Sequence, residues 1–502
     1  MSGATPAPDL LVGDIVRHAA RATPTALAAT LGDGEITFAE LDARANQVAR
    51  VLAARDVGIG DRVAWWGETS LDAMPIFNAV ARVGAAFMPV NARLGADEAG
   101  DVLEYAKPSL LIADAPHAEL ASGWASAPLT HDELFAAADR EAATDDGNPP
   151  GLTEHATHVV FFTSGSTGRP KGVVLSHRTS WLRSFQGNLT DHSGGTVCMF
   201  PLFHMSGWSM TLNAWQTRCA VHYATTPDAP TLLGTAERRR ATRLYHIPAV
   251  WQRVLDADLS AYDLSTVREC DTGTSATPPE LLEAIKGAFP GTVTRIYYGS
   301  TEVGLATMLA DADIARKPGS VGPAAVGVSI ELLDGPDGRE GEVCVRSPFL
   351  MDGYFEHPDA NGEALAPVSP GGPPWYHTGD LGVLDDEGYL SIVGRARDVL
   401  RTGGETVAPA EVEAVLATHP DIAEVAVVGL PDTEWGEVVT AVVVVREGDA
   451  VPTLDALRAH CDGRLARFKQ PRRVATVDAL PRTAATGQIQ RTLLVERLIS
   501  RP

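Results

Sequence analysis

Residues 163–172 read TSGSTGRPKG and hold three glycines, four hydroxyl side chains and one lysine. Glycines permit tight backbone turns, and the amide and hydroxyl groups of such a loop can wrap phosphate oxygens. Lys171 supplies the positive charge that a phosphate attracts. Because Lys171 is followed by Gly172, the segment is not the P-loop pattern GxxxxGK[ST]. A glycine-rich turn alone is often only a turn, but the hydroxyls and the lysine together favour phosphate binding.

This loop must be positioned by the elements on either side of it. The run HVVFFT, residues 158–163, predicts a strand that leads into the loop, and DDGNPPG, residues 145–151, predicts an earlier linker. Short β-branched runs alternate with Ala- and Leu-rich helical stretches along most of the chain. The pattern predicts an α/β fold of layered subdomains.

After Gly394 the predicted pattern of helices and strands changes, and about a hundred residues of α+β character follow. EVEAVLATH (411–419) predicts a helix, and AEVAVVGLP (423–431) and VVTAVVVV (438–445) predict strands. A second helix is predicted over residues 453–468, with Thr453 as its N-cap. The C-terminal part is therefore expected to be a smaller α+β domain.

Bulk properties restrict the class of protein. A chain of 502 residues is longer than one hydrophobic core usually supports, so we expect at least two packed units. With 64 acidic against 41 basic residues, the formal charge is −23, which argues against nucleic acid or anionic membranes as partners.

Targeting and redox signals point to the cytoplasm. The five cysteines contain no CxxC pair, a spacing that suits neither a disulfide framework nor a structural zinc site. The first residues, MSGATPAPDL, lack the order of a secretion signal. No apolar run approaches the roughly 20 residues needed to span a bilayer, so no membrane insertion is expected.

Three further segments accompany the glycine-rich loop: YYGSTEVG (297–304), WYHTGDLG (375–382) and GRARDVLRTGGETVAPAEVE (394–413). In this order and at these separations, the four motifs resemble the adenylate-forming superfamily of acyl-CoA synthetases, firefly-type luciferases and peptide-synthetase adenylation domains. FNAVARVGAAFMPVNARL (77–94) agrees with it, and the resemblance covers nearly the whole chain. It implies an N-terminal domain (1–396) that binds adenylate and acyl groups, and a mobile C-terminal domain (397–502).

The resemblance also implies roles for individual residues. The loop would cradle the β- and γ-phosphates of ATP, Tyr298 would lie against adenine, Thr301 would reach the α-phosphate, and Asp380 with Arg395 would engage the ribose. Glu302 and Thr167 would hold Mg²⁺, which prefers oxygen ligands. The nucleotide-binding residues implied are Thr163, Ser164, Gly165, Ser166, Thr167, Gly168, Lys171, Thr274, Tyr297, Tyr298, Gly299, Thr301, Asp380, Ile392 and Arg395. Taken singly, each of these residues also has a purely structural interpretation. Glu302 could lie on a solvated face, Asp380 could belong to a turn, and Tyr298 could be a core residue.

PLFHMSGW, residues 201–208, resembles the family's acyl-pocket gate. His204 stands where relatives that activate amino acids carry an aspartate for the amine, so amino-acid substrates are disfavoured; the other reading is a histidine that only packs. Trp208 would offer an apolar face, and glycines would leave room along the pocket wall. These glycines are Gly207, Gly273, Gly299 and Gly304. A medium or bulky carboxylic acid is expected.

The family's C-terminal domain swings between a pose for adenylation and a pose for thioester formation. Arg397 occupies the hinge, where relatives usually carry Asp or Lys. The loop 398–406, which includes Gly404, would line the pantetheine tunnel of coenzyme A in the second pose. RLARFKQPRR, residues 464–473, would either meet the phosphates of coenzyme A or form a solvated helix end.

One position departs from the family in a way that bears on the reaction. The family pattern ends in PRTxTGK, whose lysine contacts the acyl carboxylate and the α-phosphate during adenylation. Here residues 481–491 read PRTAATGQIQR, so Gln488 replaces that lysine and one extra alanine lengthens the loop. An amide carries no charge to offset two approaching anions. Loss of one placed donor typically costs about 10²–10³ in rate.

These features predict an acyl-CoA ligase specialised for the second half-reaction, in which an acyl-adenylate and coenzyme A give acyl-CoA and AMP. The resemblance is to lysine-less, non-adenylating members of actinobacterial specialised metabolism. The expected catalytic residues are His204, Glu302, Arg397, Gly404 and Gln488. The cofactors would be ATP or the acyl-adenylate, coenzyme A, and Mg²⁺ if adenylation is retained.

Two alternatives stay open. The chain could be an ordinary two-step, ATP-dependent acyl-CoA synthetase in which Gln488 is tolerated, or a non-catalytic binder of acyl-adenylate. The intact TGGET segment, residues 402–406, speaks against the binder. Expected partners are a carboxylic acid or its adenylate and, for the split reaction, a separate adenylating enzyme; a homodimer is also compatible.

Overall fold

The computed structural model describes residues 9–121, 128–163, 171–185, 195–333, 339–396, 398, 400–402, 405–432, 435–446, 448, 450–482 and 488–500. The chain divides into two compact units. The first consists of Met1–Gly319, Ala325–Val328 and Arg346–Leu365, and the second of Ser320–Ala324, Ser329–Val345 and Ala366–Pro502. The predicted α/β class, with a large N-terminal part and a small C-terminal one, is confirmed. The predicted boundary between residues 396 and 397 stays a prediction.

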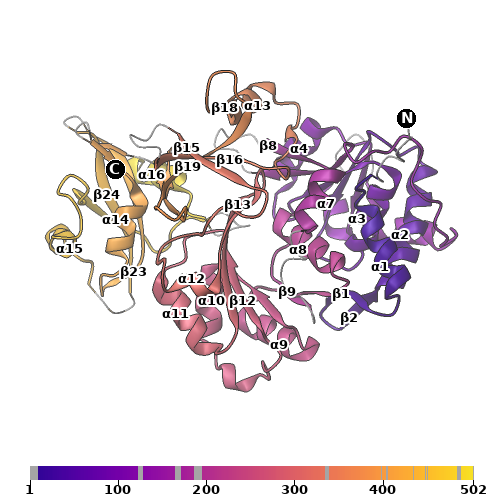
Figure 1. Cartoon of the computed structure of the whole chain (residues 1–502), viewed down its shortest axis with the longest axis horizontal. Helices are drawn as coiled ribbons and strands as arrows, with labels where there is room; N and C mark the ends of the chain where they lie inside the picture. The colour runs from indigo at the N-terminus through magenta and orange to yellow at the C-terminus, as the bar shows by residue number, and fades with distance from the viewer. Residues whose placement is uncertain are drawn as a thin grey trace. The chain divides into compact units, whose positions relative to one another are not determined.

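An eight-stranded sheet in the first unit has the order β14-β13-β12-β11-β9-β10-β1-β2. Its strands are β14 (Gly304–Leu309), β13 (Val293–Ser300), β12 (Glu269–Gly273), β11 (Arg243–Tyr245), β9 (Thr196–Cys198), β10 (Val221–Tyr223), β1 (Leu27–Leu31) and β2 (Gly34–Thr37). Neighbours from β13 through to β1 are parallel, and the outermost strands β14 and β2 are antiparallel. The helices α9, α10 and α11 lie beside β12 (Figure 1).

A seven-stranded sheet in the same unit has the order β17-β8-β7-β4-β3-β5-β6. Its strands are β17 (Gly353–Tyr354), β8 (Lys171–Ser176), β7 (Thr157–Thr163), β4 (Ala86–Val90), β3 (Arg62–Trp66), β5 (Leu110–Ala113) and β6 (Leu129–Thr130). The strand predicted over residues 158–163 is β7, and it forms an antiparallel hairpin with β8. The linker predicted over residues 145–151 contains no helix or strand.

The first unit also contains helices. They are α1 (Gly13–Ala22), α2 (Phe38–Ala53), α3 (Ala73–Val83), α4 (Ala96–Ala106), α5 (Ala115–Leu120), α6 (His131–Ala138), α7 (His177–Phe185), α8 (Met205–Gln216), α9 (Ala229–Arg239), α10 (Pro248–Leu255), α11 (Pro279–Ala288), α12 (Asp311–Ile314) and α13 (Pro358–Ala364), with the 3₁₀ turn η3 (Leu259–Ala261). Leu103 of α4 packs against Met88 of β4 and Trp66 of β3 in one buried cluster. A capping box between Thr37 and Glu40 begins α2 by satisfying amides that the helix leaves without partners.

The second unit contains two smaller sheets. One has the order β15-β16-β19-β18, with β20 paired to β19. Its strands are β15 (Ser329–Leu333), β16 (Glu340–Arg346), β19 (Pro374–Leu384), β18 (Leu365–Pro367) and β20 (Leu390–Arg395). The other has the order β22-β21-β24-β23, with β25 paired to β24. Its elements are β22 (Glu405–Val407), β21 (Leu400–Thr402), β24 (Gly436–Val445), β23 (Ile422–Asp432) and β25 (Arg473–Thr476), with helices α14 (Pro409–Leu416), α15 (Leu454–Cys461) and α16 (Arg491–Ile499).

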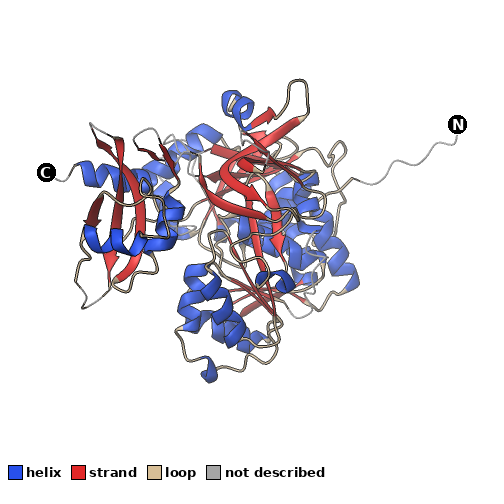
Figure 2. Ribbon diagram, turned by 60° about the vertical axis from the view of Figure 1, so that its left-hand side comes forward, coloured by secondary structure: helices blue, strands red, loops and turns tan. Residues whose placement is uncertain are grey.

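Side chains alternate across β23 and β24, as successive residues of a strand must. Val427 and Val439 face a core that includes residues of α14 and α15. Val428 and Val442 face the opposite core, which includes Leu494 of α16. The sheet is therefore covered by helices on both faces, and Figure 2 shows helices beside these strands. Both predicted strands and the helix predicted near residue 411 are confirmed.

The helix predicted over residues 453–468 is shorter than expected. Thr453 is its N-cap, since the hydroxyl accepts a hydrogen bond from the Ala456 amide at 3.2 Å. The helix ends at Cys461, however, and Gly463 adopts a φ of +75°. The C-cap Asp462 is already extended, with a ψ of 132°, and the basic run that follows forms turns rather than a helix.

All five cysteines are free thiols. Among the described residues, no helix combines the length and the apolar character that crossing a membrane requires.

Candidate active site

The β7–β8 hairpin holds the two ends of the predicted phosphate loop. Thr163 pairs with Lys171 across the hairpin, and the Thr163 hydroxyl donates to the Lys171 carbonyl at 3.3 Å. The loop ends are thus fixed by the sheet. The remaining predicted residues of this loop lie outside the described residues; they are Ser164, Gly165, Ser166, Thr167 and Gly168.

A buried arginine holds the turn that carries Thr301 and Glu302. Arg183 of α7 donates from Nη1 to the Thr301 carbonyl at 2.8 Å and from Nη2 to the Glu302 carbonyl at 2.9 Å. Its Nε donates to the Phe349 carbonyl at 2.8 Å. Burial lowers the pKa of Arg183 to about 10, so the guanidinium stays charged at neutral pH. Arg183 was not singled out from the sequence, because its acceptors are backbone atoms more than a hundred residues away.

Tyr354 connects two of the predicted site residues. Its hydroxyl donates to Oε1 of Glu302 at 3.2 Å, and Lys171 Nζ lies 5.1 Å from the centroid of its ring. The predicted phosphate-binding lysine and the predicted metal-binding carboxylate are thus brought to one side chain. Sequence reasoning missed Tyr354, and β17, which carries it, is only two residues long.

Thr274 follows the carboxyl end of β12 in an uncommon backbone conformation. Its φ is +67°, a region that non-glycine residues rarely adopt, and its hydroxyl is buried without a hydrogen-bond partner. Strained residues and unsatisfied polar groups cluster at functional sites. Thr274 therefore has the features of a ligand-facing residue, in keeping with the nucleotide role expected of it.

Tyr298 and Gly299 lie on β13, which forms a hairpin with β14. A Cβ on Gly299 would meet the Gly304 carbonyl oxygen at 1.9 Å, and a Cβ on Gly273 would meet the Tyr297 carbonyl oxygen at 2.4 Å. Neighbouring atoms therefore fill the space where a side chain at these glycines would lie, and their place along the acyl pocket stays a prediction. The same holds for Gly207, where a Cβ would lie 2.7 Å from the Pro201 carbonyl oxygen, and for Gly304, where it would lie 3.0 Å from Arg183 Nε.

Tyr297 belongs to a charged cluster within the eight-stranded sheet. Its hydroxyl lies 3.4 Å from both Arg243 Nη2 and Asp271 Oδ2. Arg243 Nε donates to Asp271 Oδ2 at 2.7 Å, and Arg295 pairs with Glu269 at 3.2 Å. Burial, reinforced by the Asp271 carboxylate, raises the pKa of Tyr297, so its hydroxyl stays protonated.

His204 begins α8. Its Nδ1 accepts a hydrogen bond from the Ser206 amide at 3.1 Å, and its ring stacks on Phe200 with centroids 6.0 Å apart. Burial lowers the pKa of His204 to about 4, so the imidazole is neutral at physiological pH. A neutral ring cannot act as the anionic partner of a substrate amine.

Trp208 differs from the expectation that it presents a face to substrate. It is 2% exposed and stacks on Phe77 with centroids 3.8 Å apart, while Phe87 meets it edge-on at 5.5 Å. A small cavity beside it, lined also by Phe77 and His158, has a volume of about 20 Å³, room for little more than one water molecule. Trp208 packs as a core residue, because Phe77 covers one face of its ring and the side chain is almost fully buried.

In the second unit, Asp380 and Arg395 form the pair that the resemblance implied. Arg395 Nε donates to Asp380 Oδ1 at 3.0 Å, and the two residues are partners across β19 and β20. The Asp380 amide donates to the Thr378 hydroxyl at 3.0 Å. Ile392 lies on the same β20 strand, three residues before Arg395.

The predicted hinge residue, Arg397, and the predicted replacement of the family's lysine, Gln488, belong to this unit in sequence. Arg397 and Gly404 fall outside the described residues, whereas Gln488 is described and exposed. Arg491 lies three residues after Gln488 and donates to Asp398 at 3.1 Å and to both oxygens of Glu413 at 2.7 and 2.8 Å. These bonds tie the start of α16 to the residue next to the predicted hinge.

Most basic side chains of residues 464–473 have partners within the second unit. Lys469 pairs with Glu411, Arg473 pairs with Asp432 at 2.9 Å, and the Arg472 guanidinium lies 3.7 Å from the centroid of the Trp435 ring. Arg464 donates to the Thr418 hydroxyl at 3.2 Å. Arg467 is exposed. Most of the basic side chains in residues 464–473 therefore already contact other groups of the second unit.

Comparison with known proteins identifies the family. The model of the AMP-binding enzyme family matches residues 16–355, and that of the AMP-binding enzyme C-terminal domain matches residues 411–486. This chain is an AMP-binding enzyme. It is 32% identical to a long-chain-fatty-acid–CoA ligase of Mycobacterium tuberculosis, with 93% of each chain covered. It is 34% identical to a feruloyl-CoA synthase of an Amycolatopsis species, with 94% of this chain and 95% of the relative covered.

A solved relative supports the same assignment. The o-succinylbenzoate CoA synthetase of Bacillus subtilis, determined with its acyl-adenylate intermediate, matches this AMP-binding enzyme with a TM-score of 0.84 and 27% identity, covering 98% of both chains. The relatives are acid–thiol ligases by name, and this AMP-binding enzyme belongs with them as an acyl-CoA ligase.

The donor set of this AMP-binding enzyme fits an adenylate. In the first unit, the orphaned hydroxyl of Thr274 and the Lys171 ammonium are groups that a nucleotide can use. In the second unit, the Asp380 carboxylate can accept hydrogen bonds from ribose hydroxyls beside Arg395. Glu302 retains acceptor capacity beyond its one bond to Tyr354, so it suits a hard cation such as Mg²⁺.

Proposed function

We propose that this enzyme mainly catalyses thioester formation, taking an acyl-adenylate and coenzyme A to acyl-CoA and AMP. Gln488 carries the proposal, because the motif resemblance places the family's adenylation lysine at this position. Adenylation brings the acid's carboxylate against the phosphates of ATP, and a neutral amide cannot offset the repulsion between these anions. Thioester formation does not require this positive charge, because the acyl-adenylate has already formed and no free carboxylate approaches ATP.

In the proposed step, the thiol sulfur of coenzyme A attacks the acyl carbonyl carbon. The new carbon–sulfur bond replaces the bond between that carbon and the phosphate oxygen, AMP leaves with the electron pair, and the thiol proton passes to solvent. Asp380 would bind the ribose, Thr301 would contact the phosphate, and Arg183 would position Thr301 through its carbonyl. Mg²⁺ at Glu302 would offset charge on ATP phosphates if adenylation is retained.

The proposed acyl group is a medium or bulky carboxylic acid without an α-amino group. The neutral imidazole of His204 offers no charge partner for an amine. Relatives named as a feruloyl-CoA synthase and a long-chain-fatty-acid–CoA ligase carry acyl groups of this size range. A separate adenylating enzyme would supply the adenylate. We place this reaction in the cytoplasm, where free thiols such as the five cysteines here persist.

Two reactions with the same acid and coenzyme A test the proposal. One contains the free acid with ATP and Mg²⁺; the other contains the preformed acyl-adenylate. Acyl-CoA from the adenylate alone supports the split ligase. Equal rates from both contradict it and identify an ordinary two-step acyl-CoA synthetase, whereas tight adenylate binding without turnover identifies a non-catalytic binder.

A further inference from the structure

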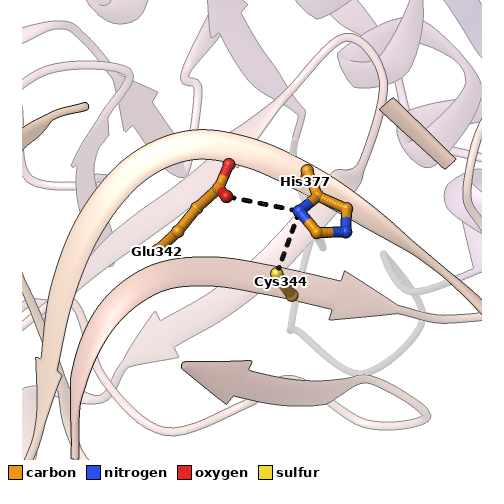
Figure 3. Close-up of side chains that lie close together, drawn as sticks. All are labelled: Glu342, Cys344 and His377. Carbon is orange, nitrogen blue, oxygen red and sulfur yellow. Dashed lines mark hydrogen bonds and ion pairs between the residues drawn. The ribbon is translucent and has the colours of Figure 1, made fainter. Parts of the chain in front are cut away.

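Three side chains with metal-ligating atoms meet on one face of the sheet that carries Asp380. Glu342 and Cys344 lie two residues apart on β16, and His377 of β19 is the cross-strand partner of Cys344. Residues two apart on a strand, and residues directly opposite each other, project from the same face. Figure 3 shows the carboxylate, the thiol and the imidazole pointing toward one another.

The imidazole is the centre of this group. Nδ1 of His377 lies 3.2 Å from Glu342 Oε2 and 3.6 Å from Cys344 Sγ. On the other side of the ring, Nε2 lies 3.3 Å from the Ala366 carbonyl oxygen. A carbonyl oxygen can only accept, so Nε2 carries the proton of a neutral ring. Nδ1 then presents its lone pair toward the carboxylate and the thiol.

This arrangement resembles one used at metal centres. A histidine ligand usually donates its other N–H to a carbonyl or carboxylate, which fixes the tautomer and the orientation of the ring. A lone pair directed at a carboxylate is unfavourable unless a proton or a cation lies between them. Among the described residues, these three are the group whose His, Cys and carboxylate ligand atoms lie close enough together to share an ion, all within 4.8 Å of one another.

We propose that Glu342, Cys344 and His377 form a site for a divalent cation of the zinc class. Zinc binds sulfur, imidazole nitrogen and carboxylate oxygen together, whereas Mg²⁺ and Ca²⁺ prefer oxygen alone. Three protein ligands leave a fourth position for water. Cys344 binds as the thiolate, and its proton is released to solvent when the ion enters. Cys344 is fully buried, while the Glu342 and His377 side chains are 25% and 16% exposed, so the ion enters past them.

The three proposed ligands lie on either side of a register shift between β16 and β19. The pairing of β16 with β19 shifts register between Glu342 and Cys344, which leaves Thr378 to Asp380 in a bulge. The second oxygen of Glu342, Oε1, accepts the Gly379 amide at 2.9 Å. An ion that joins both strands at this point would brace the bulge, and it would stabilise the folded state in proportion to its binding.

Cobalt titration of the full chain tests the proposal. Co²⁺ substitutes for zinc, and a cobalt–thiolate bond gives charge-transfer absorption in the near ultraviolet. After treatment with a chelator, the wild-type protein is expected to develop this absorption with one Co²⁺ per chain and to lose it when Zn²⁺ is added. The readout is optical, so it does not depend on any acyl-CoA activity.

Variants assign the ligands. Cys344→Ser is expected to abolish the absorption, and Glu342→Gln and His377→Gln to weaken Co²⁺ binding by at least about 10-fold. The half-buried thiol of Cys219 provides the control, and Cys219→Ser should behave as wild type. Zn²⁺ should raise the Tm of the wild type but not of His377→Gln, which keeps a test available if Cys344→Ser does not fold. No charge-transfer absorption in the wild type, or an unchanged one in Cys344→Ser, would overturn the site and leave a hydrogen-bonded triad.

Discussion

The hydroxyl of Tyr354 donates to Oε1 of Glu302 across 3.2 Å, so a tyrosine from a two-residue strand orients the carboxylate that we propose as a ligand of Mg²⁺. Tyr354→Phe removes this bond but keeps the ring beside Lys171. A hydrogen bond to a charged group contributes about 1.5–3 kcal/mol. We therefore expect the Kd for ATP to rise about 10-fold in the presence of Mg²⁺ and to change little without it, as measured by calorimetry.

Tyr105→Phe is the matched control, because the Tyr105 hydroxyl donates to the Phe355 carbonyl instead. It should leave ATP binding unchanged. Equal weakening by Tyr354→Phe with and without Mg²⁺ would show that Glu302 does not act through the metal.

Gln488→Lys tests the proposed function, because it adds the positive charge that we propose the adenylation step lacks. We expect the rate of ATP–pyrophosphate exchange with a substrate acid to rise by about 10²–10³. Gln490→Lys, at another exposed position nearby, adds the same charge and should give no rise. If exchange stays at the wild-type level in Gln488→Lys, the missing charge is not the main obstacle, and the lengthened loop before it becomes the explanation.

Arg183→Lys tests how the turn at Thr301 and Glu302 is held. A lysine keeps the charge but cannot reproduce three guanidinium bonds to three carbonyls. We expect the Kd for ATP to rise about 10-fold while the KM for coenzyme A stays constant. Arg178→Lys on the same helix serves as the control, since Arg178 donates to Glu154 at 2.6 Å. A parallel rise in both constants would indicate a general loss of structure.

His177 gives the protein a pH-dependent stability. Burial lowers its pKa to about 4 from an unfolded value near 6.5. Because the unfolded chain takes up the proton first, the stability contribution is complete above pH 6.5 and is lost as the pH falls toward 4. The free energy of unfolding should fall by up to about 3 kcal/mol from this group.

Denaturant titrations at a series of pH values check this slope. His177→Gln can still accept the bond that the Val12 amide donates to Nδ1, and it should flatten the dependence. The exposed residue His155 provides the control, and His155→Gln should keep the wild-type slope. An unchanged slope in His177→Gln would assign the pH dependence to other groups.

Short stretches of neighbouring residues are sufficient to predict much of the secondary structure. The strands β7, β23 and β24 follow from short β-branched runs, and Thr453 caps its helix as its residue type predicts. Each of these depends on a few neighbouring residues. The sequence pattern continues to Phe468, whereas the helix ends at Cys461, where the backbone becomes extended at Asp462 and left-handed at Gly463.

Contacts between distant segments could not be anticipated in the same way. Arg183 lies 118 residues before Thr301, and its acceptors are carbonyls, which every residue carries. Trp208 was expected to face a ligand because its type suits an apolar pocket, yet stacking on Phe77 gives it a core role. Asp380 and Arg395 were anticipated because a motif specifies the pair, and their cross-strand register then brings them together.

The close approach at Gly299 and Gly304 limits how this enzyme could be redesigned or could diverge. With a hypothetical Cβ at Gly299 only 1.9 Å from the Gly304 carbonyl oxygen, no side chain fits without separating β13 from β14. A mutant library that enlarges position 299 is therefore expected to yield destabilised proteins rather than altered substrate preference. At Gly299 the β13–β14 hairpin thus accepts only glycine in its present backbone conformation.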